Sequence, residues 1–124
     1  MKKKLLLCFI GMAFLVGCSA LIPSMSPPVW IHGTWSDEFG LTNYTFTETT
    51  MLQTNLYITL DMAEFFRDLD VFPDERITNT VYSFTVPDEM GGYTMEFSKV
   101  DTNTIDLTMK MSGATIGPTR LYRQ

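Results

Sequence analysis

Apolar and polar residues alternate along most of the chain after residue 29. The pattern is clearest over residues 93–98 and 104–111, where every second side chain is apolar. This alternation places apolar side chains on one face of a β-strand and polar side chains on the other. The sequence Asp-Thr-Asn at 101–103 separates the two runs and predicts a hairpin connection. We therefore expect antiparallel strands with one buried face.

Shorter runs with the same alternation predict the other strands, at 31–36, 44–46, 56–60, 82–86 and 119–123. The total is about seven, or about eight if residues 43–60 hold more than one hairpin. An open sheet would leave its apolar face in water, so the strands must close on themselves or cover a second sheet. We expect a mainly β fold, a small antiparallel up-and-down barrel of about seven to eight strands.

The period changes in the segment DMAEFFRDL, residues 61–69. Asp61 and Glu64 have the spacing of a helix N-cap and the acidic residue that follows it. Four apolar side chains then recur at helical spacing, namely Met62, Phe65, Phe66 and Leu69. We expect one short amphipathic helix that closes one end of the sheet.

Residues 1–17 have the three-part composition of a secretory signal. Three lysines precede an apolar segment at 5–16, which is shorter than the ~20 residues that span a bilayer as a helix. The sequence LVGC at 15–18 resembles the bacterial lipobox. That resemblance implies cleavage before Cys18 and acylation of the cysteine, and several acyl chains suffice to hold a protein at a membrane. An ordinary secretory signal with a chance cysteine is the alternative.

Three segments follow from this pattern: a lipoprotein signal peptide at 1–17, a Pro/Ser-rich tether at 18–28 and the barrel domain at 29–124. Cys8 is removed with the signal, so the mature chain has no second cysteine for a disulfide. We expect a protein anchored in the bacterial cell envelope. Ser19 is not the aspartate that retains enteric lipoproteins in the inner membrane, which favours the outer membrane if the cell has one.

Without the signal, the chain keeps six basic and fourteen acidic residues, a formal charge of −8. Nucleic-acid binding is disfavoured, because its affinity comes from Lys and Arg neutralising phosphates. A cationic protein partner fits the charge, although an acidic surface also serves solubility alone.

Chemistry-bearing residues are few. His32 is the only histidine, so no catalytic Ser-His-Asp or Cys-His group can form without it. The acidic residues of the run RDLDVFPDE lack the glycine turn of a calcium loop: Asp68, Asp70, Asp74 and Glu75. We expect no enzyme, no metal site and no cofactor.

The sequence IHGTWSDE at 31–38 resembles the GxW motif that opens lipocalin-like barrels, with Gly33 and Trp35 as its fixed residues. The final run TRLYR at 119–123 is similar to the last strand of small bacterial members. The resemblance implies that Trp35 plugs one end of the barrel and that Arg120 or Arg123 lies across its ring in a cation–π contact. Two departures are a shorter chain and a helix after the early strands instead of after the last.

Apolar side chains on the helix and on inward strand faces are the candidate lining of a ligand pocket: Phe65, Phe66, Phe84, Tyr93, Met95, Phe97, Met109 and Met111. Flexible methionines suit a pocket that adapts to an apolar guest. They equally fill gaps in a solid core. Two functions stay open: an envelope lipoprotein that binds a small apolar or amphiphilic ligand, or an interaction or inhibitor-type lipoprotein with a solid barrel that docks an envelope component or a cationic protein.

Overall fold

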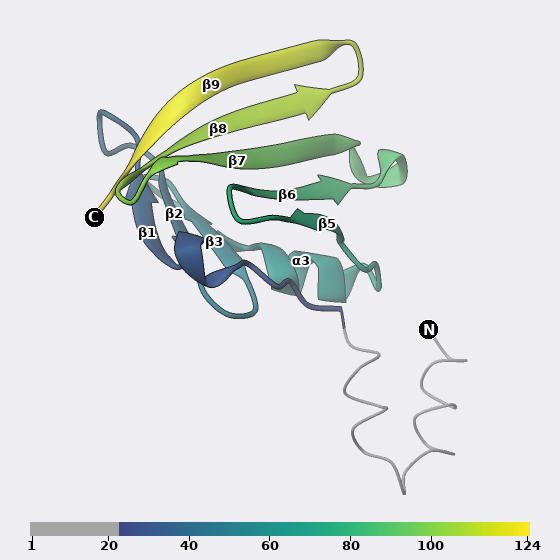
Figure 1. Ribbon diagram of the computed structural model, residues 1–124. Helices are drawn as coiled ribbons and strands as arrows, with labels where there is room; N and C mark the ends of the chain where they lie inside the picture. Colours follow the sequence, from purple (N-terminus) through teal and green to yellow (C-terminus); the bar gives the residue numbers. More distant parts are fainter. Residues whose placement is uncertain (1–22) are drawn as a thin grey trace, which may run out of the picture.

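A computed structural model describes residues 23–124, which form a curled antiparallel sheet with a short α-helix against it (Figure 1). The expected signal peptide and Cys18 lie outside these residues. The nine strands of the described part are β1 Gly33–Ser36, β2 Asn43–Phe46, β3 Met51–Thr54, β4 Thr59–Asp61, β5 Asp74–Ile77, β6 Val81–Val86, β7 Tyr93–Asp101, β8 Thr104–Met111 and β9 Ala114–Arg123. Helix α3 spans Met62–Asp68, and two 3-10 turns lie at Val29–Ile31 (η2) and Asp88–Met90 (η3).

Neighbouring strands in sequence pair as hairpins everywhere except between β4 and β5. The order across the sheet is β4-β3-β2-β1-β9-β8-β7-β6-β5. The first and last strands meet, with Trp35 opposite Arg123 and Ser36 opposite Tyr122. Helix α3 connects β4 to β5, the two strands at the edges of the sheet (Figure 1). The prediction of a mainly β, up-and-down barrel with one short helix is confirmed, as a curled half-barrel.

The sheet has nine strands where we expected seven or eight, and one expected strand is wrong in its position. Residues 55–58, which alternate like a strand, form the turn between β3 and β4. Asn55 Oδ1 accepts hydrogen bonds from the backbone N–H groups of Tyr57 (3.2 Å) and Ile58 (3.1 Å). An asparagine that bonds to the backbone two and three residues ahead favours a turn over a strand.

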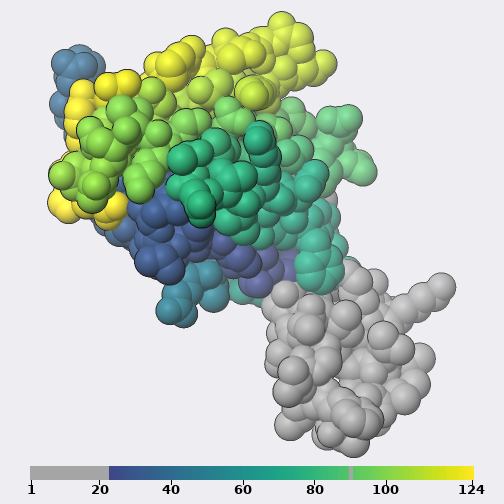
Figure 2. Space-filling view, viewed as in Figure 1, coloured from purple at the N-terminus to yellow at the C-terminus, as the bar shows by residue number. Residues whose placement is uncertain are grey.

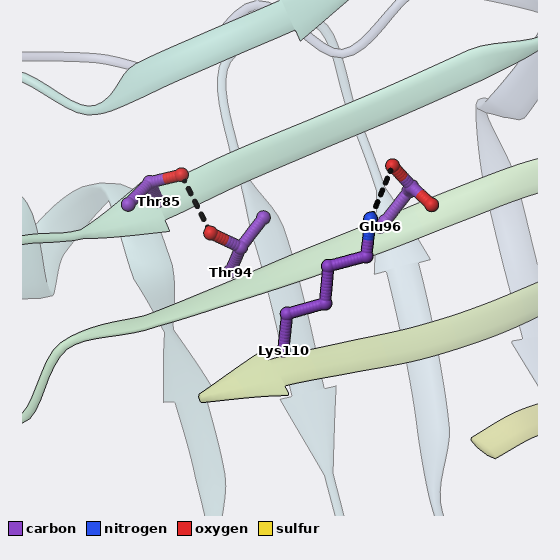
Figure 3. A network of polar contacts seen from close by, with 4 residues as sticks. All are labelled: Thr85, Thr94, Glu96 and Lys110. Atoms are coloured by element: carbon purple, nitrogen blue, oxygen red, sulfur yellow. Dashed lines mark hydrogen bonds and ion pairs between the residues drawn. The ribbon is translucent and has the colours of Figure 1, made fainter. Parts of the chain in front are cut away.

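The two faces of the sheet differ in polarity as the alternation predicts. On the outer face of β6, β7 and β8, Thr85 Oγ1 lies 2.8 Å from Thr94 Oγ1, and Lys110 Nζ lies 3.5 Å from Glu96 Oε1 (Figure 3). On the inner face of the same three strands, apolar residues pair in one row: Phe84, Met95 and Met109.

The hydrophobic core fills the inside of the curl. Phe46 from β2 and Phe97 from β7 meet there edge to face, with ring centroids 4.9 Å apart, a favoured arrangement for aromatic pairs. The largest fully buried side chains are Trp35, Tyr82, Phe46, Phe66, Phe84, Phe97, Met25, Ile31, Met51, Met62, Met95 and Ile105. Aromatic rings from both halves of the sheet therefore share one packed interior.

Helix α3 begins where the sequence predicts. Asp61 caps it, since Oδ1 accepts a hydrogen bond from the Glu64 N–H (3.2 Å), and this cap satisfies a backbone donor at the helix start. Phe66 turns into the core against Phe84, with centroids 6.1 Å apart. The helix ends one residue before Leu69, which is 41% exposed and does not join the predicted apolar face.

Residues 23–28, the last part of the expected tether at 18–28, pack against the domain. Met25 is 1% exposed, and its N–H donates to the carbonyl of Thr49 in the β2–β3 turn (3.0 Å). The Ser26 N–H donates to Glu75 Oε2 on β5 (2.8 Å). Figure 2 shows this purple segment lying against the teal strands. We call the end of the barrel that residues 23–32 cover the closed end.

Candidate interaction surface

Trp35 lies at the closed end, and Arg123 covers its ring. The indole Nε1 donates to the carbonyl of Ile31 (2.8 Å), and the guanidinium carbon of Arg123 lies 4.2 Å from the ring centroid. Arg120 is elsewhere, paired with Asp106 on the outer face (2.7 Å). Pairing with β8 sets Arg120 opposite Asp106, whereas pairing with β1 sets Arg123 opposite Trp35. This register, which alternation alone cannot provide, distinguishes the two arginines.

The Arg123 guanidinium also ties three segments together. Its nitrogens donate to the carbonyls of His32 (2.7 Å), Trp30 (3.2 Å) and Thr102 (3.1 Å). Gly33 adopts φ +116°, and a Cβ there would lie 3.0 Å from the guanidinium. Gly33 therefore supplies both the backbone conformation and the space that this arrangement requires.

His32 has a structural partner at the closed end. Its Nε2 lies 2.8 Å from the carbonyl oxygen of Pro27, so this nitrogen donates the hydrogen bond. In residues 23–124, no group of three His, Cys, Asp or Glu side chains is arranged to hold a metal ion, and no helix there is long and apolar enough to cross a bilayer.

Most of the candidate pocket residues belong to the core. Four are fully or almost fully buried: Phe66, Phe84, Met95 and Phe97. Phe65, Tyr93 and Met109 are half-buried against the core, and burial raises the pKa of the Tyr93 phenol. Met111 is 38% exposed, near the far tip of the β8–β9 hairpin. The eight residues therefore do not form one continuous lining.

A groove of about 450 Å³ runs between β4 and α3. Its walls are Leu52, Thr59, Leu60, Asp61, Glu64, Phe65 and Asp68. Phe65 is the one candidate pocket residue that borders it. The groove mixes apolar side chains with three carboxylates, and it lies outside the packed interior.

Two neighbouring loops expose large apolar side chains at the end opposite the closed end. Residues 37–42 join β1 to β2, and residues 55–58 join β3 to β4; both line a shallow depression of about 330 Å³. Leu41, Leu56, Tyr57 and Ile58 form what we call the loop-tip patch, with exposures of 52%, 69%, 92% and 64%. Contiguous exposed apolar side chains commonly mark an interaction site. Sequence reasoning missed this patch, because the 56–60 alternation resembles a half-buried strand.

Side-chain hydrogen bonds hold both loops in place. Asp37 Oδ1 accepts from the N–H groups of Phe39 (3.1 Å) and Leu41 (2.9 Å). Asn55 does the same for Tyr57 and Ile58, and the Asn55 N–H donates to the Ile58 carbonyl (3.0 Å). The patch is therefore presented on bonded turns, which lowers the entropy cost of binding a partner.

No protein-family model, curated protein or solved structure matches this chain significantly. The candidate features on which a function can rest are therefore the packed interior, the Trp35–Arg123 plug and the loop-tip patch.

Proposed function

We propose that the protein is a lipid-anchored, lipocalin-like envelope protein that acts by docking another protein on its surface, and that it is not an enzyme. The observation that carries this proposal is the burial of Phe66, Phe84, Met95 and Phe97 in the core. These residues are four of the eight candidate lining residues of the expected ligand pocket. Side chains buried together in a packed core leave little room for a guest, which favours the solid-barrel alternative.

The lipocalin-like part of the proposal is supported by geometry at the closed end. Gly33 and Trp35 open the first strand, which pairs with the last strand, and Arg123 stacks on the indole. An arginine of the last strand across the tryptophan ring is the relation that the GxW resemblance implies. The anchoring part rests on the lipobox residues 15–18, with cleavage before Cys18 and retention in the bacterial envelope, the outer membrane where there is one.

A second candidate function, binding of a small apolar ligand, is favoured by one feature outside the packed core. The inner face of β7, β8 and β9 continues beyond it, with Tyr93 opposite Met111 and Met109 opposite Ile116. Ile116 is 52% exposed and Met111 38%. Figure 2 shows the yellow-green end of this hairpin projecting beyond the rest of the domain. A ligand would bind here on an open sheet face, not inside the barrel.

Mass spectrometry of the full chain, purified in detergent from bacterial membranes, tests the lipid anchor and the solid barrel. Intact mass after denaturation should show cleavage before Cys18 with acyl chains attached, and the Cys18→Ala variant should lack them. Native mass, measured after the detergent is stripped in the gas phase, should equal the denatured mass. A reproducible extra mass lost on denaturation would favour the ligand-binding alternative, and an unacylated cleaved chain would refute the anchor.

A further inference from the structure

We infer that the loop-tip patch is the docking surface for a protein whose contact region is apolar and bordered by Lys or Arg side chains. The patch lies on the side of the domain that faces away from the anchoring membrane, and the partner binds there. This inference rests on the proposed function and names the partner's chemistry. It draws on the exposure of Leu56, Tyr57 and Ile58, on the position of the patch in the barrel and on the charge around it.

The exposure of the patch has no folding rationale. Tyr57 is 92% exposed on a turn fixed by Asn55, so its ring gains almost no burial from the fold, and its neighbours Leu56 and Ile58 stay mostly exposed. Aromatic side chains held on a rigid support are typical of binding hot spots, because little conformational freedom remains to be lost on association.

The position of the patch points it away from the bilayer. The chain enters the domain at the closed end, where Met25 bonds to the β2–β3 turn at Thr49. Cys18 lies five residues before Pro23, a reach of at most about 17 Å, so the expected anchor keeps the closed end near the membrane. Strands β1 to β4 then run between that end and the two apolar loops.

The charge around the patch selects its partner. Asp37 and Glu38 lie in the same loop as Leu41, and residues 23–124 carry fourteen acidic against six basic side chains. A second copy of this chain would bring the same carboxylates together, and anionic lipid headgroups would meet like charge as well. Basic side chains around an apolar contact would instead be attracted, which identifies a protein surface with that composition.

Photocrosslinking in the cells that produce the protein tests this inference on the full chain. The probe is p-benzoylphenylalanine, placed at position 57 and, as a matched control, at position 122, where Tyr122 is 44% exposed on β9. We expect a discrete protein adduct from position 57 and none from position 122. Adding Leu56→Ser should reduce that adduct about tenfold or more, whereas Leu69→Ser, an exposed leucine outside the patch, should leave it unchanged.

Other outcomes overturn the inference. A phospholipid adduct would assign the patch to a membrane, and a crosslinked dimer would assign it to a second copy. An adduct that persists with Leu56→Ser, or the absence of any adduct, would remove the patch as a docking surface. Equal melting curves for the two serine variants exclude unfolding as the cause of a loss. The mass measurements on Cys18 and on bound ligand stay valid in each case, so failure of the docking surface is distinct from failure of the anchored solid barrel.

Discussion

The closed end and the loop end lie on the same strands and are both rich in apolar side chains, yet these side chains have opposite environments. Trp35 at the closed end is 1% exposed, whereas Tyr57 at the loop end is 92% exposed. Both ends have a fixed backbone: Arg123 bonds three carbonyls at one, and Asp37 and Asn55 bond the turns at the other. Similar composition and similar local order therefore serve different purposes at the two ends.

The difference lies in what burial contributes to folding. Apolar area removed from water stabilises a fold by roughly 25 cal/mol per Å², and Trp35 at the closed end is removed from water almost completely. The loop-tip patch keeps its area in water and contributes little to the free energy of unfolding. Under the proposed docking function its apolar side chains would contact a partner, and substitutions at the two ends should separate stability from binding.

The largest expected effect is on the plug. Trp35→Ala should lower the free energy of unfolding by about 3–5 kcal/mol, because it empties a fully buried site in a packed core. Tyr57→Ala should change it by no more than about 0.5 kcal/mol, as expected for an exposed position. Urea denaturation of both variants measures the contrast. Similar losses for the two would show that the loop end also supports the fold.

The two arginines of β9 give the next contrast. Arg123→Ala should cost about 2–3 kcal/mol, since it leaves the carbonyls of Trp30 and His32 without their charged donor and removes the contact with the Trp35 ring. Arg120→Ala removes a solvent-exposed ion pair with Asp106 and should have little effect. Equal midpoints in denaturant for the two variants would contradict the role of Arg123 at the closed end.

The sequence predicts these features unevenly, and the reasons are physical. Period-two alternation is strong where one face of a strand is buried, so β6, β7 and β8 are visible in it. The edge strand β5, with the sequence DERI, has no such contrast and is missed. The alternation at residues 56–60 predicts a strand where the chain turns. The Asn55 side chain accepts a hydrogen bond from the Ile58 N–H within that turn, and Leu56 and Ile58 stay in water.

Site residues show the same division. The GxW motif is local, so Gly33 and Trp35 can be recognised from sequence, but the arginine that stacks on Trp35 depends on the register of β9 against β1. Pocket residues are harder still. Inward-facing positions such as Phe84 and Met111 alternate alike, and only the three-dimensional curl of the sheet separates the packed center from the open hairpin tip.

The smallest expected effect concerns Tyr82, which is fully buried and donates to Glu75 Oε2 (2.6 Å). Burial, followed by the bond and charge of Glu75, raises the pKa of the Tyr82 phenol far above its ordinary value of 10. The unfolded chain therefore loses this proton first, and the stabilisation is complete below about pH 10 and declines above it. One such tyrosine makes the free energy of unfolding fall with pH more steeply, by about 1.4 kcal/mol per pH unit.

Denaturation of the wild type and of Tyr82→Phe between about pH 10 and pH 11 measures this slope. The free energy of unfolding of the variant should fall less steeply with pH than that of the wild type, by about 1.4 kcal/mol per pH unit. Tyr44 and Tyr93, whose pKa values burial also raises, contribute to both chains and cancel in the difference. If Tyr82→Phe keeps the wild-type slope, the Tyr82 phenol is not held protonated in the core.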